Sequence, residues 1–111
     1  MTTKNAIATT WQDLRTDESR KVEKVLLEAF ESVDAYRYNS ASLRVRVVDP
    51  RFRGLTNEQR DDMVEPVLAK LDRDTEADIM NLVFLYPGEV DESSDAFLIN
   101  YEFEHPSESM L

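Results

Sequence analysis

Apolar residues recur at helical spacing in two stretches of the chain. The first predicts a helix from about residue 17 to 31, opened by Thr16 as a cap with acidic residues in its first turn. The second follows Thr56 and Gln59, which form a capping-box pattern. Its stripe consists of Met63, Val64, Val67, Leu68 and Leu71. Pro66 lies inside this second stretch, so we expect a kink or two short helices meeting near residue 65.

Alternation of apolar and polar residues predicts strands elsewhere. Residues 36–38 and 43–47, separated by Asn39 and Ser40, are typical of a β-hairpin with one apolar and one arginine-rich face. Residues 79–86 are almost continuously apolar, which indicates a strand that is buried on both faces or central in the sheet. Residues 97–103 alternate and predict a half-buried fourth strand. The polar residues 72–78 and the acidic residues 87–95 are expected to be connections.

The predicted order is helix, strand, strand, helix, strand, strand. It favours an α+β fold with the helices packed on one face of a four-stranded mixed sheet. A chain of 111 residues fits a single domain, 1–111, with residues 1–10 as a loose N-terminal arm and residues 106–111 as a frayed tail. No apolar run reaches the length of a membrane helix, and the N-terminus does not resemble a secretory signal, so we expect a cytoplasmic protein that binds no membrane.

The composition argues against catalytic chemistry. The chain has no cysteine and a single histidine, His105, which excludes thiol nucleophiles, disulfides and thiolate metal sites. Its two glycines do not form a phosphate-binding motif, and the acids of residues 89–95 lack the spacing of a calcium loop. Carboxylate pairs such as Asp61 and Asp62 are unremarkable in so acidic a chain. We therefore expect no enzyme, no cofactor and no metal.

Charge is distributed very unevenly along the chain. Five arginines and one aspartate give residues 36–53 a net charge of +4, which leaves −14 for the remainder and −10 in total. Residues 74–111 contain ten acidic residues and no lysine or arginine. This balance disfavours nucleic acid and anionic membranes as partners, because phosphate affinity depends on accumulated Lys and Arg.

Two interpretations of the basic hairpin remain open. Arg44 and Arg46 share one strand face, where they could pair with Glu102 and Glu104 or form an anion- or partner-binding site. The tyrosines of the hairpin also suggest a stacking platform for single-stranded nucleic acid. The candidate binding residues are Tyr36, Arg37, Tyr38, Arg44, Arg46, Arg51 and Arg53.

Residues 43–71 resemble BolA-like proteins. The run from Arg44 to Gly54, which reads RVRVVDPRFRG, is similar to their strand ending in a Phe-x-Gly turn, and the helix residues that match are Arg60, Met63, Val64, Leu68 and Leu71. The resemblance implies a topology shared with type II KH domains and an affinity for protein partners. The family histidine that holds an iron–sulfur cluster with glutaredoxins is absent, since residues 78–81 read DIMN and Asp61 occupies a second position that is often histidine. The resemblance therefore does not imply cluster binding.

These observations favour a non-enzymatic protein-interaction domain with an adaptor or regulatory role. The alternative is an RNA- or ssDNA-binding module that uses the hairpin, and a third hypothesis, a small carboxylate enzyme, requires a buried acidic pocket. If an outer strand is uncovered, edge pairing would favour a twofold homodimer.

Overall fold

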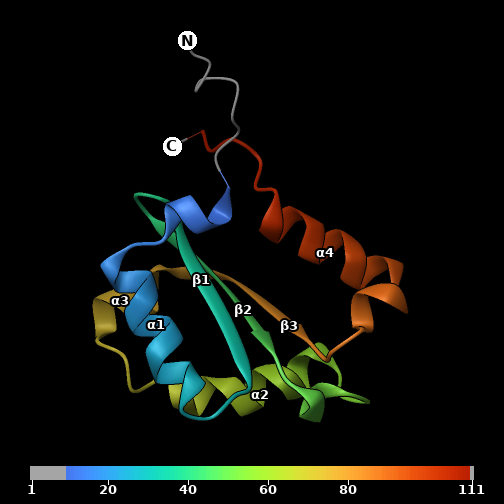
Figure 1. Ribbon diagram of the computed structural model, residues 1–111. Coiled ribbons are helices and arrows are strands. Elements are labelled where there is room, and N and C mark those ends of the chain that lie inside the picture. Colours follow the sequence, from blue (N-terminus) through green and yellow to red (C-terminus); the bar gives the residue numbers. More distant parts are fainter. Residues whose placement is uncertain (1–9, 111) are drawn as a thin grey trace.

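The computed structural model describes residues 10–110, so the predicted loose arm lies outside the described residues except for Thr10. Helices and strands follow one another in the order expected as far as the third strand (Figure 1). The elements are η2 (Trp11–Leu14), α1 (Asp17–Leu27), β1 (Ser32–Asn39), β2 (Ser42–Val48), η3 (Pro50–Phe52), α2 (Asn57–Leu68), α3 (Arg73–Asp78), β3 (Ile79–Leu85), η4 (Glu89–Asp91) and α4 (Ser94–Glu104).

The sheet has three strands, not the predicted four, in the order β1-β2-β3. β1 and β2 form the expected antiparallel hairpin, and β3 pairs parallel to β2, so the α+β class with a mixed sheet is confirmed. β3 therefore forms one edge of the sheet. Its residues Val83, Phe84 and Leu85 are buried on both faces, which explains the continuous apolar run without a central position.

Helices cover both faces of the sheet rather than one. Alternate residues of each strand point to opposite faces, and each face has its own apolar core. On one face, Val45 and Phe84 pack with Val22 and Leu26 of α1 and with residues of α2. On the other face the core consists of Trp11, Tyr36, Val83, Leu85, Ala96 and Phe103, contributed partly by η2 and α4. In Figure 1, α4 lies apart from α1 and α2, across the sheet.

The predicted fourth strand is wrong because residues 97–103 belong to helix α4. The Ser93 hydroxyl caps this helix by accepting from the Ala96 N–H, and Asp95 lies in the first turn. Ala96 and Phe103 are its buried residues, seven positions apart and so on one helical face. Because residues 97–103 are mostly apolar, they fit both the helical and the strand period. The Ser93 cap favours the helix.

Three smaller differences concern the connections. α1 ends at Leu27, four residues before the predicted end. α2 continues through Pro66 as one helix to Leu68, so two helices do not meet at residue 65. The polar segment 72–78 contains the short helix α3, capped by Asp72, whose carboxylate accepts from the Thr75 N–H.

The C-terminal segment contacts β1. The Tyr38 hydroxyl donates to the Ser107 carbonyl at 2.6 Å, and the Asn39 side chain donates to Ser109 at 3.0 Å. The predicted frayed tail thus has two hydrogen bonds to the hairpin. No helix among residues 10–110 is both long and apolar enough to cross a bilayer.

Candidate functional site

Arg44 and Arg46, the arginine face of β2, lie beneath α4. Arg46 Nη1 donates to Glu104 at 2.6 Å and to Asn100 at 2.8 Å, while Nη2 donates to Asp34 at 2.7 Å. Its guanidinium also lies over the Phe103 ring, 4.7 Å from the centroid. Only 11% of the Arg46 side chain is exposed. This arginine joins the sheet to α4.

Arg44 makes a similar set of contacts with α4, two residues earlier in the helix. Its Nη1 donates to Glu102 at 3.0 Å, and its guanidinium stacks on Tyr38, 3.7 Å from the ring centroid. The Ser107 N–H, and after it Arg44, hold the pKa of Glu102 below its ordinary value. Of the two alternatives left open by the sequence, the structure shows pairing with Glu102 and Glu104. Glu102 and Glu104 lie on helix α4, not on the predicted fourth strand.

Tyr36 and Tyr38 are engaged by the same helix and the tail. Tyr36 is fully buried, its hydroxyl donates to the Phe103 carbonyl at 2.7 Å, and burial raises its pKa. Tyr38 is covered on one ring face by Arg44. A base therefore cannot stack on Tyr36, and Arg44 already occupies one ring face of Tyr38.

The three remaining candidate arginines lie outside this helix–sheet contact. Arg37 bonds to Asp78 at 2.9 Å and to Glu18 at 3.3 Å. Arg51 bonds to Asp49 at 2.8 Å, with 56% of its side chain exposed. Arg53 is the most exposed of the seven candidate residues and lies 4.2 Å from the Tyr86 ring centroid. The structure thus divides the candidates among separate places and does not bring them together in one open site.

The titratable side chains of the described residues mostly have partners within the fold. Among residues 10–110, no three His, Asp or Glu side chains gather at metal-binding distance. Glu89 of the acidic loop bonds to the buried Arg60 at 2.8 Å, and His105 packs against the Tyr101 ring. The buried carboxylate Asp49 has Arg51 and two backbone N–H groups as partners, and the Arg51 hydrogen bond foremost lowers its pKa to about 2. Each of these groups therefore contacts another side chain of the fold.

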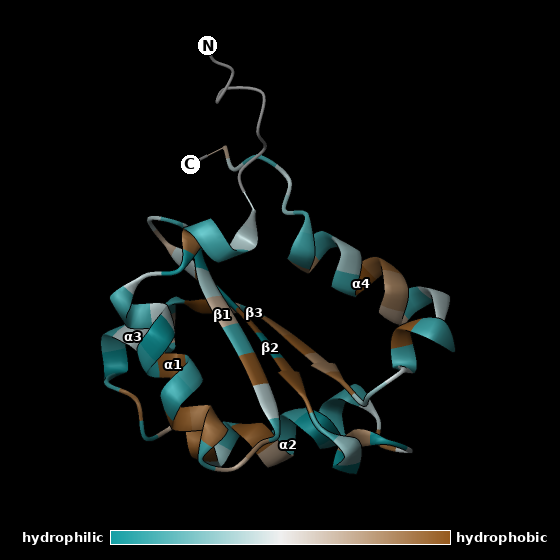
Figure 2. Cartoon of the chain, viewed as in Figure 1, coloured by the Kyte–Doolittle hydropathy of each residue, from teal (hydrophilic) through white to brown (hydrophobic). Residues whose placement is uncertain are grey.

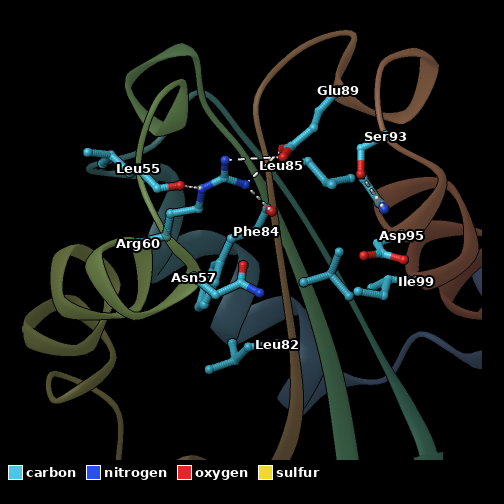
Figure 3. Close-up of a pocket in the computed structure, with 12 residues that line it drawn as sticks. Leu55, Asn57, Arg60, Leu82, Phe84, Leu85, Glu89, Ser93, Asp95 and Ile99 are labelled. Atoms are coloured by element: carbon cyan, nitrogen blue, oxygen red, sulfur yellow. Dashed lines mark hydrogen bonds and ion pairs between the residues drawn. The ribbon is translucent and has the colours of Figure 1, made fainter.

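A surface that the sequence did not reveal lies along the edge of β3. A cavity of about 260 Å³ opens between the start of α2, the edge of β3 and α4 (Figure 3). Its lining includes Asn57 and Arg60 from α2, Leu82 and Phe84 from β3, and Ile99 from α4. Arg60 donates to the Phe84 carbonyl at 2.8 Å and so occupies one edge acceptor. We call this cavity and the strand edge the β3 groove.

Large apolar side chains continue from the β3 groove over the outside of α4. We call Phe97, Leu98, Ile99 and Tyr101 the apolar face of α4; between 48% and 62% of each is exposed, and the same region appears apolar in Figure 2. Leu98 and Ile99 also line a second cavity of about 260 Å³ beside Asn81 of β3. Met80, at the start of β3, is 70% exposed. Apolar residues concentrated next to an open strand edge are typical of a docking surface.

None of the family models, curated proteins and solved structures compared with this chain matches it. Its function must therefore be inferred from the arrangement of its own residues.

Proposed function

We propose that this chain is a non-enzymatic protein-interaction domain whose docking surface is the β3 groove with the apolar face of α4. The observation that carries the proposal is the free strand edge. β3 carries no charged residue or proline between Ile79 and Leu85, and among the described residues its one strand partner is β2. Natural sheet edges are ordinarily protected by charge, proline, bulges or a covering segment. β3 has one of these features, a register shift against β2 between Ile79 and Asn81, and beyond it, from Leu82 to Leu85, the uncharged edge is suited to accept another strand.

The flanking side chains support the same interpretation. An added strand obtains affinity from main-chain hydrogen bonds and specificity from pockets for alternate side chains. Here the two cavities that share Ile99 lie beside β3 and offer apolar surface at its side. The resemblance of residues 43–71 to BolA-like proteins also suggests a preference for protein partners.

The alternative function, an RNA- or ssDNA-binding module, has weaker support. Arg44 and Arg46 would have to exchange their ion pairs under α4 for phosphate contacts, and Tyr36 is inaccessible. Only Arg51 and Arg53 present substantially exposed guanidinium groups among the candidates. A salt titration with mixed oligonucleotides tests this alternative, which requires binding that weakens steeply as salt rises.

The proposal is tested by protein capture with matched surface variants. Leu98→Lys places a charge on the apolar face of α4, and Leu27→Lys places the same charge on a comparably exposed leucine of α1. We expect proteins retained by the wild type to be lost with Leu98→Lys and retained with Leu27→Lys. Equal retention by both variants, or turnover of a metabolite by the purified chain, would contradict the proposal.

A further inference from the structure

The regular part of the β3 edge is short and offers few backbone groups. β3 pairs regularly with β2 over residues 81–85, after the register shift. The Leu85 carbonyl accepts from the backbone that follows β2, so Leu82 and Phe84 direct their N–H and C=O groups outward. Within residues 10–110 these outward groups have one hydrogen-bond partner, Arg60, on the Phe84 carbonyl. Both Leu82 groups and the Phe84 N–H are left for an added strand.

The two faces beside this edge differ in chemistry. The side chains of Leu82 and Phe84 pack in the core shared with α1 and α2, whereas Val83 and Leu85 belong to the core beneath α4. An added strand therefore directs alternate side chains towards α2 and towards α4. Those that point towards α4 meet its apolar face, of which Ile99 lines the β3 groove (Figure 3).

The α2 side of the groove is acidic. Asn57 lines the cavity, and Asp61 and Glu65 follow it at intervals of four residues, which places all three on one stripe of the helix. Asp95, an exposed residue at the start of α4, lines the same cavity. Among the described residues, the ion pairs involve none of these three acids. The groove is thus flanked by carboxylates whose charge the fold does not neutralise, in a chain with a net charge of −10.

We infer that the occupant of the β3 groove is an extended peptide segment in which basic and apolar residues alternate. The inference rests on the proposed function and specifies the chemistry of its partner. The main chain of the segment bonds to Leu82 and Phe84, and its apolar side chains pack on the apolar face of α4. Its Lys or Arg side chains point the other way, towards Asp61 and Glu65. Alternation is required because only a strand with period two presents one kind of side chain to each face.

Peptide binding to the full chain tests this inference. The probe is a fluorescently labelled peptide of about ten residues that alternates lysine and valine. A peptide that alternates glutamate and valine tests the charge, and a peptide with the same lysines and valines in two blocks tests the alternation. By fluorescence anisotropy at low salt, we expect binding of the alternating lysine peptide alone, weakening as salt rises. No binding of that peptide up to millimolar concentration, or equal binding of the block peptide, would overturn the inference.

Matched variants of α2 test the position of the basic side chains. Asp61→Lys reverses a charge on the groove stripe. Asp62→Lys makes the same change in net charge at an exposed neighbour, rotated about 100° further round the helix. We expect a dissociation constant for the alternating lysine peptide about fivefold higher with Asp61→Lys than with Asp62→Lys. Equal values for the two variants would contradict the inferred position.

N-methylated peptides test strand addition without changing the protein. In an added strand every second N–H faces β3, so methylation of the lysine nitrogens alone and of the valine nitrogens alone removes different sets of bonds. We expect one of these two peptides to bind at least about tenfold more weakly than the other. In an antiparallel pair the residues opposite Leu82 and Phe84 are lysines that bond to β3, so the lysine set matters, and in a parallel pair the valine set matters. Equal weakening by both sets would contradict strand addition.

The outcomes separate this inference from the proposed function. If the alternating lysine peptide fails these tests while protein capture still depends on Leu98, the docking function stands with an occupant of other chemistry. If capture does not depend on Leu98 either, both proposals fail.

Discussion

Replacing Arg46 with methionine should detach α4 from the sheet. Methionine retains an apolar chain of similar length over Phe103 but loses the hydrogen bonds to Asp34, Asn100 and Glu104. Hydrogen bonds to charged groups contribute about 1.5–3 kcal/mol each. Asp34 keeps Arg15, and Glu104 can regain water because 39% of its side chain is exposed, so the losses are partly offset. We expect the free energy of unfolding to fall by about 2–4 kcal/mol, a large share of a typical domain's 5–15 kcal/mol.

Urea unfolding followed by two probes measures this effect. Trp11 is the only tryptophan and packs against Phe103, with ring centroids 5.7 Å apart, so its fluorescence reports the contact between α4 and the sheet. Circular dichroism reports the helices as a whole. In Arg46→Met we expect the fluorescence transition at lower urea than the dichroism transition, which is the signature of local detachment.

Arg53→Met is the matched control. Arg53 is 62% exposed and lies 3.8 Å from Glu92, so its removal should change the free energy of unfolding by less than about 0.5 kcal/mol. A loss below about 1 kcal/mol for Arg46→Met, or equal losses for the two variants, would refute the structural role assigned to the arginine face.

Three further predictions concern single polar groups. The Arg51 hydrogen bond foremost lowers the pKa of Asp49 from 3.8 to about 2, so the ionised carboxylate should contribute about 2 kcal/mol to the free energy of unfolding. This contribution is fully present above pH 3.8 and is lost as the pH falls towards 2. Asp49→Asn should abolish this pH dependence in urea titrations at several pH values. Tyr36→Phe should cost about 1–3 kcal/mol because it leaves the Phe103 carbonyl without its donor, and thermal unfolding that matches the wild type would contradict this. Ser93→Ala should cost about 1 kcal/mol through loss of the α4 cap, measured by the same thermal unfolding, and an unchanged midpoint would show that the cap is dispensable.

Local patterns predicted the first two-thirds of the fold. Thr16 and Thr56 cap α1 and α2 as the sequence indicates, and Leu43, Val45 and Val47 are buried on one face of β2 as their alternation requires. These features depend on neighbouring residues alone. They need no knowledge of distant contacts.

The end of the chain could not be predicted in the same way. Most of the apolar residues of α4 are exposed, so their spacing does not indicate which helical face is buried. In Phe97–Phe103, apolar and polar residues alternate as they would in a strand. Glu102 and Glu104 reach the arginine face from a helix because they flank the buried Phe103. β3 is an edge strand because residues 97–103 form part of a helix and not a fourth strand beside it. Apart from the uncharged sequence of β3, no local pattern indicated the candidate docking surface.

Amide hydrogen exchange of β3 tests the central claim most directly. The Leu82 and Phe84 N–H groups face outward from β3, whereas the Val83 N–H faces β2 and serves as the internal reference. In the dilute chain we predict fast exchange at Leu82 and Phe84 and slow exchange at Val83. When a captured partner is bound, all three should exchange slowly. Unchanged fast exchange at Leu82 and Phe84 in the bound state would contradict docking at the β3 edge.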